Sequence, residues 1–161
     1  MGMSFGMIFS IILIVFFIVV GGIAVNAFLK WQKEMQLGLA IKELDGAIKL
    51  AFNSENYDKT VKISFPSGVQ EVCFINWSAQ VSSDASNIDS EIFNYARKQT
   101  HKIENNFFIY SPDRDYNIRF ATVKYIDLTS KNPICITLKN SVASIKIQRT
   151  FENPLVRVSE V

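Results

Sequence analysis

The stretch that decides the fold lies near the N-terminus and reads MIFSIILIVFFIVVGGIAVNAFL over residues 7–29. Its only polar side chains are those of Ser10 and Asn26, and all 17 Lys/Arg and all 15 Asp/Glu of the 161-residue chain lie at or after Lys30. At about 1.5 Å of rise per residue, this stretch makes about 35 Å of helix, enough to cross the roughly 30 Å hydrocarbon core of a bilayer. We therefore predict a transmembrane helix.

A cleaved secretory signal and a buried helix of a soluble domain are the two alternatives for this stretch. A signal needs a basic n-region, a shorter apolar run and a small-residue cleavage site. Residues 1–6 contain no Lys or Arg, the apolar run is longer than a signal requires, and Asn26-Ala27-Phe28 is a poor cleavage sequence. We expect the helix to be retained as an anchor.

Small residues stand at two places in this part of the chain. Gly2, Gly6 and Ser10 are spaced four residues apart, which places them on one helix face and permits close approach of another helix. Gly and Ser are also common in membrane helices without any such role. Gly21 and Gly22 are adjacent, and each weakens a helix by up to about 1 kcal/mol in water, so we expect a bend or an unwound turn there. These five residues are the candidates for helix packing.

The helical pattern continues beyond the apolar stretch as KWQKEMQLGLAIKELDGAIKLAFN, without proline. Trp31 beside Lys30 is typical of an anchor at the membrane interface. Apolar residues then follow a 4-3-4-3 spacing with charged residues on the other faces, as in an amphipathic helix. The apolar positions are Leu37, Ile41, Leu44, Ile48 and Ala51, with Phe52 beside them. We predict that this face packs on the rest of the chain.

From Thr60 the apolar period changes from helical spacing to two, which indicates strands. A short helix capped by Asn87 or Asp89 is expected among them. The predicted strands are 60–65 and 69–77, forming a hairpin around Pro66-Ser67-Gly68, then 106–111, 118–128, 134–138 and 142–150, the last two forming a hairpin around 139–141, and finally 155–161. The fold class is therefore α+β, a long N-terminal helix packed on a small antiparallel sheet of about five to seven strands. Its parts are an apolar helix over 1–29, an amphipathic extension over 30–53 and a β-rich domain over 60–161.

The two cysteines, Cys73 and Cys135, each lie among apolar residues in a predicted strand. They form no C-x-x-C motif, and with a single histidine the chain has too few nitrogen and sulfur ligands for a structural zinc. The two cysteines could form a disulfide or remain as two buried free thiols, and we favour the disulfide. It implies that the β-rich domain faces an oxidising exterior. Lys30 and Lys33 on the domain side oppose this orientation by the positive-inside rule.

Nothing in the sequence is typical of a reaction, and the net charge of +2 favours no class of partner. Phosphate-cradling glycine loops, nucleophile elbows and HExxH motifs are absent. His101 has no neighbouring acid or nucleophile, and the basic pair Arg97-Lys98 is too small for a nucleic-acid footprint. The acids that could offer oxygens to calcium match no EF-hand spacing and read better as surface carboxylates: Asp84, Asp89, Asp113 and Asp115. We predict no catalytic residue, metal, cofactor or nucleic-acid partner.

Asn76-Trp77-Ser78 is an N-x-[ST] sequon. A chain with this content of Asn, Ser and Thr contains one or two such triplets by chance, so the alternative is an unmodified asparagine. If the β-rich domain is external, Asn76 is a candidate for N-glycosylation.

An uncharged apolar N-terminus that runs into an amphipathic helix and then into a small sheet with two cysteines resembles the type IV pilins and pilin-like subunits. Bacterial pilins carry an acidic residue early in the helix, whereas the first acid here is Glu34, so the archaeal type is the better match. The pieces FPSGVQEVCF and NPICITLKNSVASIKI are also similar to uncharacterised single-pass proteins of small-genome archaea.

The resemblance implies a structural subunit whose helix spans the membrane before assembly and then packs with its own copies in the core of a filament. The protein would be membrane-anchored and then extracellular, its main partner would be itself, and its sheet domain would form the surface used in adhesion. The alternative is a bitopic membrane protein whose external β domain binds another protein or a glycan. A membrane-tethered enzyme is the least favoured class.

Alkylation tests the predicted pairing of Cys73 with Cys135. We expect no thiol in the denatured, unreduced protein and two after reduction. Cys135→Ala should lower the free energy of unfolding by about 2–5 kcal/mol, because the bridge closes a long loop in the unfolded chain. Two free thiols before reduction would contradict the bridge and weaken the external placement.

Overall fold

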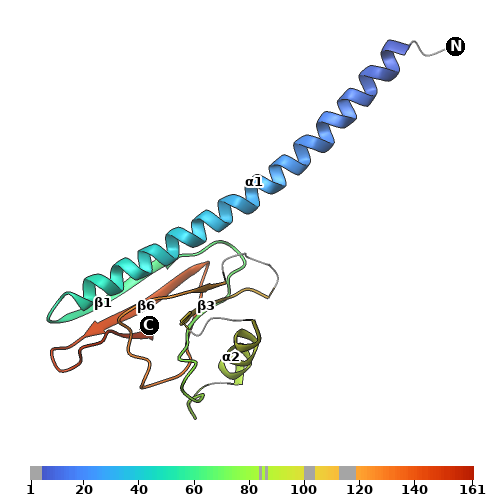
Figure 1. Ribbon diagram of the computed structural model, residues 1–161. Coiled ribbons are helices and arrows are strands. Elements are labelled where there is room, and N and C mark those ends of the chain that lie inside the picture. The colour runs from blue at the N-terminus through green and yellow to red at the C-terminus, as the bar shows by residue number, and fades with distance from the viewer. Residues whose placement is uncertain (1–4, 84, 86, 100–103, 113–118) are drawn as a thin grey trace. The chain divides into compact units, whose positions relative to one another are not determined.

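The computed structural model describes residues 5–83, 85, 87–99, 104–112 and 119–161. It is an α+β protein with a long N-terminal helix and two antiparallel sheets (Figure 1). The elements are α1 (Phe5–Phe52), β1 (Tyr57–Ser64), β2 (Glu71–Phe74), α2 (Asn87–Gln99), β3 (Phe107–Tyr110), β4 (Phe120–Ala121), β5 (Ile134–Thr137), β6 (Val142–Arg149) and β7 (Arg157–Glu160). The chain divides into two units, Met1–Met35 and Gln36–Val161, which we describe separately.

The first unit contains α1 up to Met35. No proline interrupts α1, so its backbone hydrogen bonds continue from turn to turn. Every large apolar side chain over residues 7–29 is exposed, from 39% at Leu13 to 69% at Phe17. This part of the helix therefore has no apolar partner within its own unit.

The second unit begins with the last part of α1, which packs on the sheets as predicted. Five residues on its inner face are buried: Leu37, Ala40, Leu44, Ile48 and Ala51. Ile41 and Phe52 are partly buried against the same core, whereas Leu39 and Leu50 on the opposite side are exposed. The amphipathic pattern thus identified the buried face correctly.

Arg149 of β6 caps the C-terminus of α1. Its guanidinium donates hydrogen bonds to the carbonyls of Phe52 and Ser54, and it lies over the Phe52 ring, 5.2 Å from the centroid. A cation here also complements the negative end of the helix dipole. This contact fixes the end of α1 against the sheet that contains β6.

The first sheet, sheet A, has the order β1-β6-β7 and is antiparallel. Its apolar residues alternate with exposed or half-exposed ones, so one face lies on the core and the other faces solvent. The inner face is formed by Ile63, Ala143, Ile145, Ile147 and Val158. Figure 1 shows β1 and β6 beside the last part of α1.

The second sheet, sheet B, has the order β4-β3-β2-β5 and is also antiparallel. Val72 and Phe74 of β2 belong to the main core with α1, whereas Cys73 belongs to a second cluster under α2. Successive residues of a strand point to opposite faces, so β2 is buried on both of them. The helices α1 and α2 therefore cover opposite faces of sheet B.

Both predicted hairpins are wrong in their pairing, because the partners belong to different sheets. β1 pairs with β6, and β2 pairs with β3 and β5. The predicted turn at 139–141 does form: Asn140 and Ser141 have positive φ, and Lys139 bridges Val142. Beyond that bridge the two strands separate. β2 carries buried residues toward both α1 and α2, and β5 buries Ile134 and Ile136 in the main core and half-buries Cys135 under α2. β1 and β6 instead keep one face exposed to solvent, so burial separates strands that are neighbours in sequence.

The long strand predicted over 118–128 is also wrong. Within the described residues it reduces to β4, followed by an isolated parallel bridge from Ile126 to Val156. Tyr125 has φ 68°, which interrupts an extended backbone. The predicted single sheet is accordingly two sheets of three and four strands.

A charge placed on the inner face of α1 tests this packing. Leu44→Asp should lower the free energy of unfolding by at least about 3 kcal/mol, because Leu44 is completely buried and the new carboxylate would have no partner. Leu39→Asp is the matched control, since Leu39 is 62% exposed on the same helix. Chemical denaturation of both variants decides the matter. Equal stability of the two would show that the helix face is assigned incorrectly.

Candidate functional site

The apolar surface of α1 over residues 7–29 is the first candidate site. Among the described residues, the segment Gly6–Phe52 contains one span long and apolar enough to cross a membrane, near the N-terminus. The hydroxyl of Ser10 donates a hydrogen bond to the carbonyl of Gly6 at 2.9 Å. The side chain thus satisfies its own donor inside the helix and places no unpaired donor on the apolar surface.

The predicted helix-packing residues fall as follows. Gly6 and Ser10 are exposed one turn apart on α1, and Gly2 lies outside the described residues. The helix continues through Gly21 and Gly22 without a break, so the expected unwound turn does not form. A side chain added at either of these two glycines would meet nothing within 4 Å. Nothing in the unit itself therefore requires glycine there.

The disulfide is the second candidate. Cys73 of β2 and Cys135 of β5 are directly paired in the ladder, their Cα atoms 4.0 Å apart and their sulfurs 2.09 Å apart. This geometry fits the predicted pairing. The bond joins two neighbouring strands of sheet B on the face covered by α2, where Ile92 and Phe93 belong to the same cluster.

Glu71 lies two residues before Cys73 on the same face of β2. Its carboxylate and the two sulfurs lie within 4.8 Å of one another. Both sulfurs are consumed by the disulfide, so this group offers one carboxylate and no thiolate to a metal. Burial raises the pKa of Glu71, and the negative charges of Asp89 and Glu160 raise it further. One carboxylate oxygen of Glu71 is buried and has no hydrogen-bond partner in the described part of the chain.

The sequon at Asn76 forms a turn held by Asn132. The side-chain oxygen of Asn132 accepts from the Asn76 N–H at 2.8 Å, and its amide nitrogen donates to the Asn76 carbonyl at 2.9 Å. The side-chain oxygen of Asn76 accepts from the Ser78 N–H at 3.0 Å, which closes an Asx turn. Trp77 packs on Phe93 and donates to the carbonyl of Asn105. Asn76 is partly exposed.

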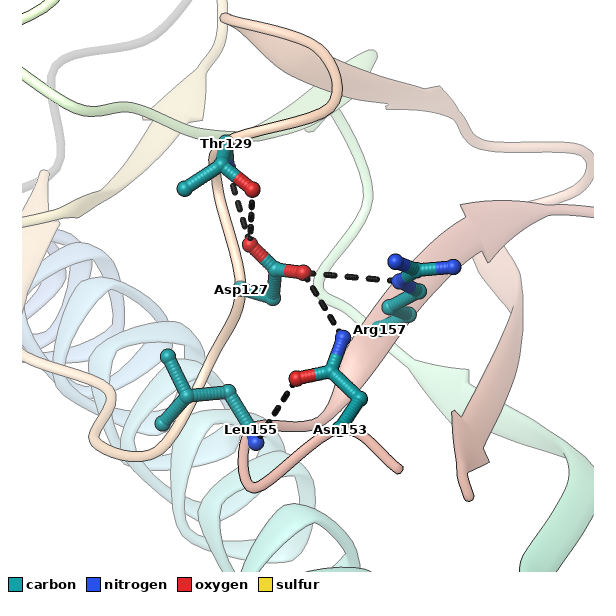
Figure 2. Close-up of polar contacts among 5 residues, drawn as sticks. All are labelled: Asp127, Thr129, Asn153, Leu155 and Arg157. Carbon is teal, nitrogen blue, oxygen red and sulfur yellow. Dashed lines mark hydrogen bonds and ion pairs between the residues drawn. The ribbon is translucent and has the colours of Figure 1, made fainter. Parts of the chain in front are cut away.

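Asp127 holds the chain that leads into β7. Figure 2 shows its carboxylate between Thr129 and the segment of Asn153 and Arg157. It accepts hydrogen bonds from the Thr129 N–H at 3.0 Å and hydroxyl at 2.6 Å, and from the Asn153 amide at 3.0 Å. The Arg157 guanidinium lies 3.4 Å away. Asn153 in turn accepts from the Leu155 N–H at 3.1 Å.

These contacts lower the pKa of Asp127 to about 2, with the hydrogen bond from the Thr129 hydroxyl as the largest cause and those from Asn153 and the Thr129 N–H next. Asp127 is only 5% exposed, so its charge is stabilised by fixed donors in place of water. The cluster has a structural role, because it joins residues 127–129 to residues 153–157. The ladder between these two parts of the chain is limited to the isolated bridge from Ile126 to Val156.

The remaining predicted residues are placed as follows. His101, Asp84, Asp113 and Asp115 lie outside the described residues. Asp89 lies in the first turn of α2 and forms an ion pair with Lys131 at 3.8 Å. It is therefore part of a salt bridge that connects α2 to the chain before β5.

Sequence reasoning missed three polar residues that hold the second unit together, namely Asn132, Asp127 and Arg149. The Asp127-Leu128-Thr129 triplet has the side chains of an Asx turn and could have been noticed. Asn132 and Arg149 form hydrogen bonds with segments far away in sequence, and a local sequence pattern cannot predict such contacts.

Comparison with known proteins adds no relative: no family model, no curated protein and no solved structure matches this chain. The assignment of a function therefore depends on the chain's own residues.

Asp127→Asn tests the polar cluster and its pH dependence. The substitution should lower the free energy of unfolding by about 1–3 kcal/mol at pH 7, because charge-assisted hydrogen bonds are lost. The pKa of Asp127 is lowered from 3.8 to about 2, so its stabilisation is complete above pH 4 and is lost as the pH falls through about 2.

The difference between wild type and Asp127→Asn should therefore shrink over that pH interval, measured by urea denaturation at each pH. Asp45→Asn is the control, because Asp45 is exposed on α1, and it should change stability by less than about 0.5 kcal/mol. A difference that stays constant down to pH 2 would contradict the role of the carboxylate.

Proposed function

We propose that the protein is a structural, pilin-like subunit that is anchored in a membrane by α1 and assembles through the same helix into an extracellular filament. The single observation that carries the proposal is that every large apolar side chain over residues 7–29 is exposed. A helix that is apolar on all sides needs either lipid or other helices around it.

Two features of α1 support contact with other copies as well as with lipid. Gly6 and Ser10 leave a shallow face where a second helix can approach closely, and the Ser10 hydroxyl is already bonded within its own helix. The segment over 7–29 has no charged side chain, so complete burial among identical helices leaves no ion unpaired.

The second unit supports an external location. A disulfide persists in oxidising compartments, and the bond between Cys73 and Cys135 joins β2 to β5 in this unit. We therefore place the unit Gln36–Val161 outside the cell, on the filament surface, where adhesive contacts would be made.

Gly6→Leu tests assembly separately from anchoring. The added side chain lengthens the hydrophobic run and should leave membrane insertion intact, but it obstructs close helix contact at the Gly6–Ser10 face. We expect the filament yield in shear fractions, counted by electron microscopy, to fall by about tenfold or more. Membrane fractionation of the same cells measures insertion.

Ile12→Leu is the matched control. Ile12 is exposed on the same helix, and leucine keeps an apolar side chain of the same volume there. This variant should insert and assemble normally. A wild-type chain that stays monomeric in mild detergent, with no filaments at native expression, would overturn the proposal and favour the bitopic receptor-like alternative.

A further inference from the structure

A cavity of about 270 Å³ lies between α2 and sheet B. Its lining residues are Glu91, Ile92 and Tyr95 from α2 and Tyr110 from the end of β3. Figure 1 shows α2 beside β3. The volume lies just below the range of about 300–1,000 Å³ typical of sites for drug-sized ligands. A ligand of about one sugar residue is the size that it admits.

The walls offer two aromatic rings. Tyr95 and Tyr110 stand edge to face with their centroids 6.1 Å apart, and Tyr95 also packs on Phe108 at 6.2 Å. Tyr95 is 40% exposed although its neighbours Ile92 and Ala96 on the same helix are buried. The rings are therefore held by the fold while part of their surface remains open to a ligand.

The polar groups of the cavity can both accept and donate. Within the described residues, neither the Glu91 carboxylate nor the Tyr110 hydroxyl has a hydrogen-bond partner. The Tyr95 oxygen accepts a hydrogen bond from the Arg119 guanidinium at 2.8 Å, which leaves the Tyr95 O–H to donate. The site thus combines the Glu91 carboxylate as an acceptor, the Tyr95 hydroxyl as a donor, and the Tyr110 hydroxyl, which can donate or accept.

We propose that this cavity binds a saccharide, with one sugar ring against Tyr95 and Tyr110 and its hydroxyls bonded to Glu91 and the tyrosine hydroxyls. A pyranose presents C–H groups on its faces, which suit the negative face of an aromatic ring, and hydroxyls at its rim that donate and accept.

The charges around the cavity favour a neutral ligand over an ion. A cation would be drawn to Glu91 but repelled by the Arg119 guanidinium at the Tyr95 hydroxyl, and an anion would experience the reverse. Asp89 is paired with Lys131 at 3.8 Å. Glu71 lies directly opposite Tyr110 in the ladder, and burial raises its pKa, which favours the uncharged carboxyl. A polyhydroxylated, uncharged ring satisfies both kinds of group at once.

This site does not depend on the proposed filament, since all its residues belong to the unit Gln36–Val161. The test uses the full chain in a polyoxyethylene detergent, whose headgroup contains neither sugar nor ammonium. The probes are the methyl glycosides of glucose, galactose, mannose and N-acetylglucosamine, with tetramethylammonium as the cationic alternative. Saturation-transfer NMR reports which of them binds.

We expect at least one glycoside to bind and tetramethylammonium not to bind. Glu91→Ala and Tyr110→Phe should each weaken the binding by about tenfold, because each removes a hydrogen-bonding group from the cavity. Glu91 is exposed and Tyr110→Phe keeps the ring, so both variants should retain the fold. Asn94→Ala is the matched control, since Asn94 is exposed on α2 and does not line the cavity.

Absence of binding by every glycoside, or binding of tetramethylammonium in their place, would overturn the proposal. Glycoside binding that Glu91→Ala and Tyr110→Phe leave unchanged would also overturn it, because the sugar would then lie elsewhere. Filament assembly is measured in the same variants. Loss of sugar binding with filaments retained separates this site from assembly through α1.

Discussion

The organisation of the unit Gln36–Val161 depends on one constraint, which is that sheet B must be covered on both faces. Val72, Cys73 and Phe74 are consecutive in β2 and all completely buried, although they point alternately to opposite sides. A strand that is apolar on both sides cannot expose either face to solvent. The last part of α1 covers one side and α2 covers the other, and the disulfide lies in the layer under α2.

Sheet A is under no such constraint, and it differs accordingly. Its strands alternate buried and exposed residues, so one face suffices to complete the main core around Leu44 and Ile48 of α1. The chain between the two sheets is held in place by two polar side chains, each of which forms several hydrogen bonds. Asn132 binds the turn at the sequon, and Asp127 binds the segment before β7. Such groups satisfy buried backbone atoms where no ladder is available.

The apolar surface over residues 7–29 is not covered by any other described element of its own unit. Beyond Gln36 the inner face of α1 is buried by the chain itself, whereas before Met35 the helix has no partner in its own unit. We propose that its partner is lipid or another chain. This requirement is the basis for proposing an anchor and an assembly surface in one helix, with the binding of a sugar assigned to the other unit.

The sequence by itself determined the helix, its apolar length and its buried inner face at Leu37, Leu44 and Ile48, because these depend on local composition and on a period of 3.6 residues. It also located most strands and named Cys73 and Cys135 as a pair. The pairing of β1 with β6, the division into two sheets and the meeting of Tyr95 with Tyr110 were decided only by the tertiary structure. A strand with one buried face alternates apolar and polar residues whichever strand it pairs with, so this pattern does not identify its partner. The partner is decided by burial and register between segments far apart in the chain.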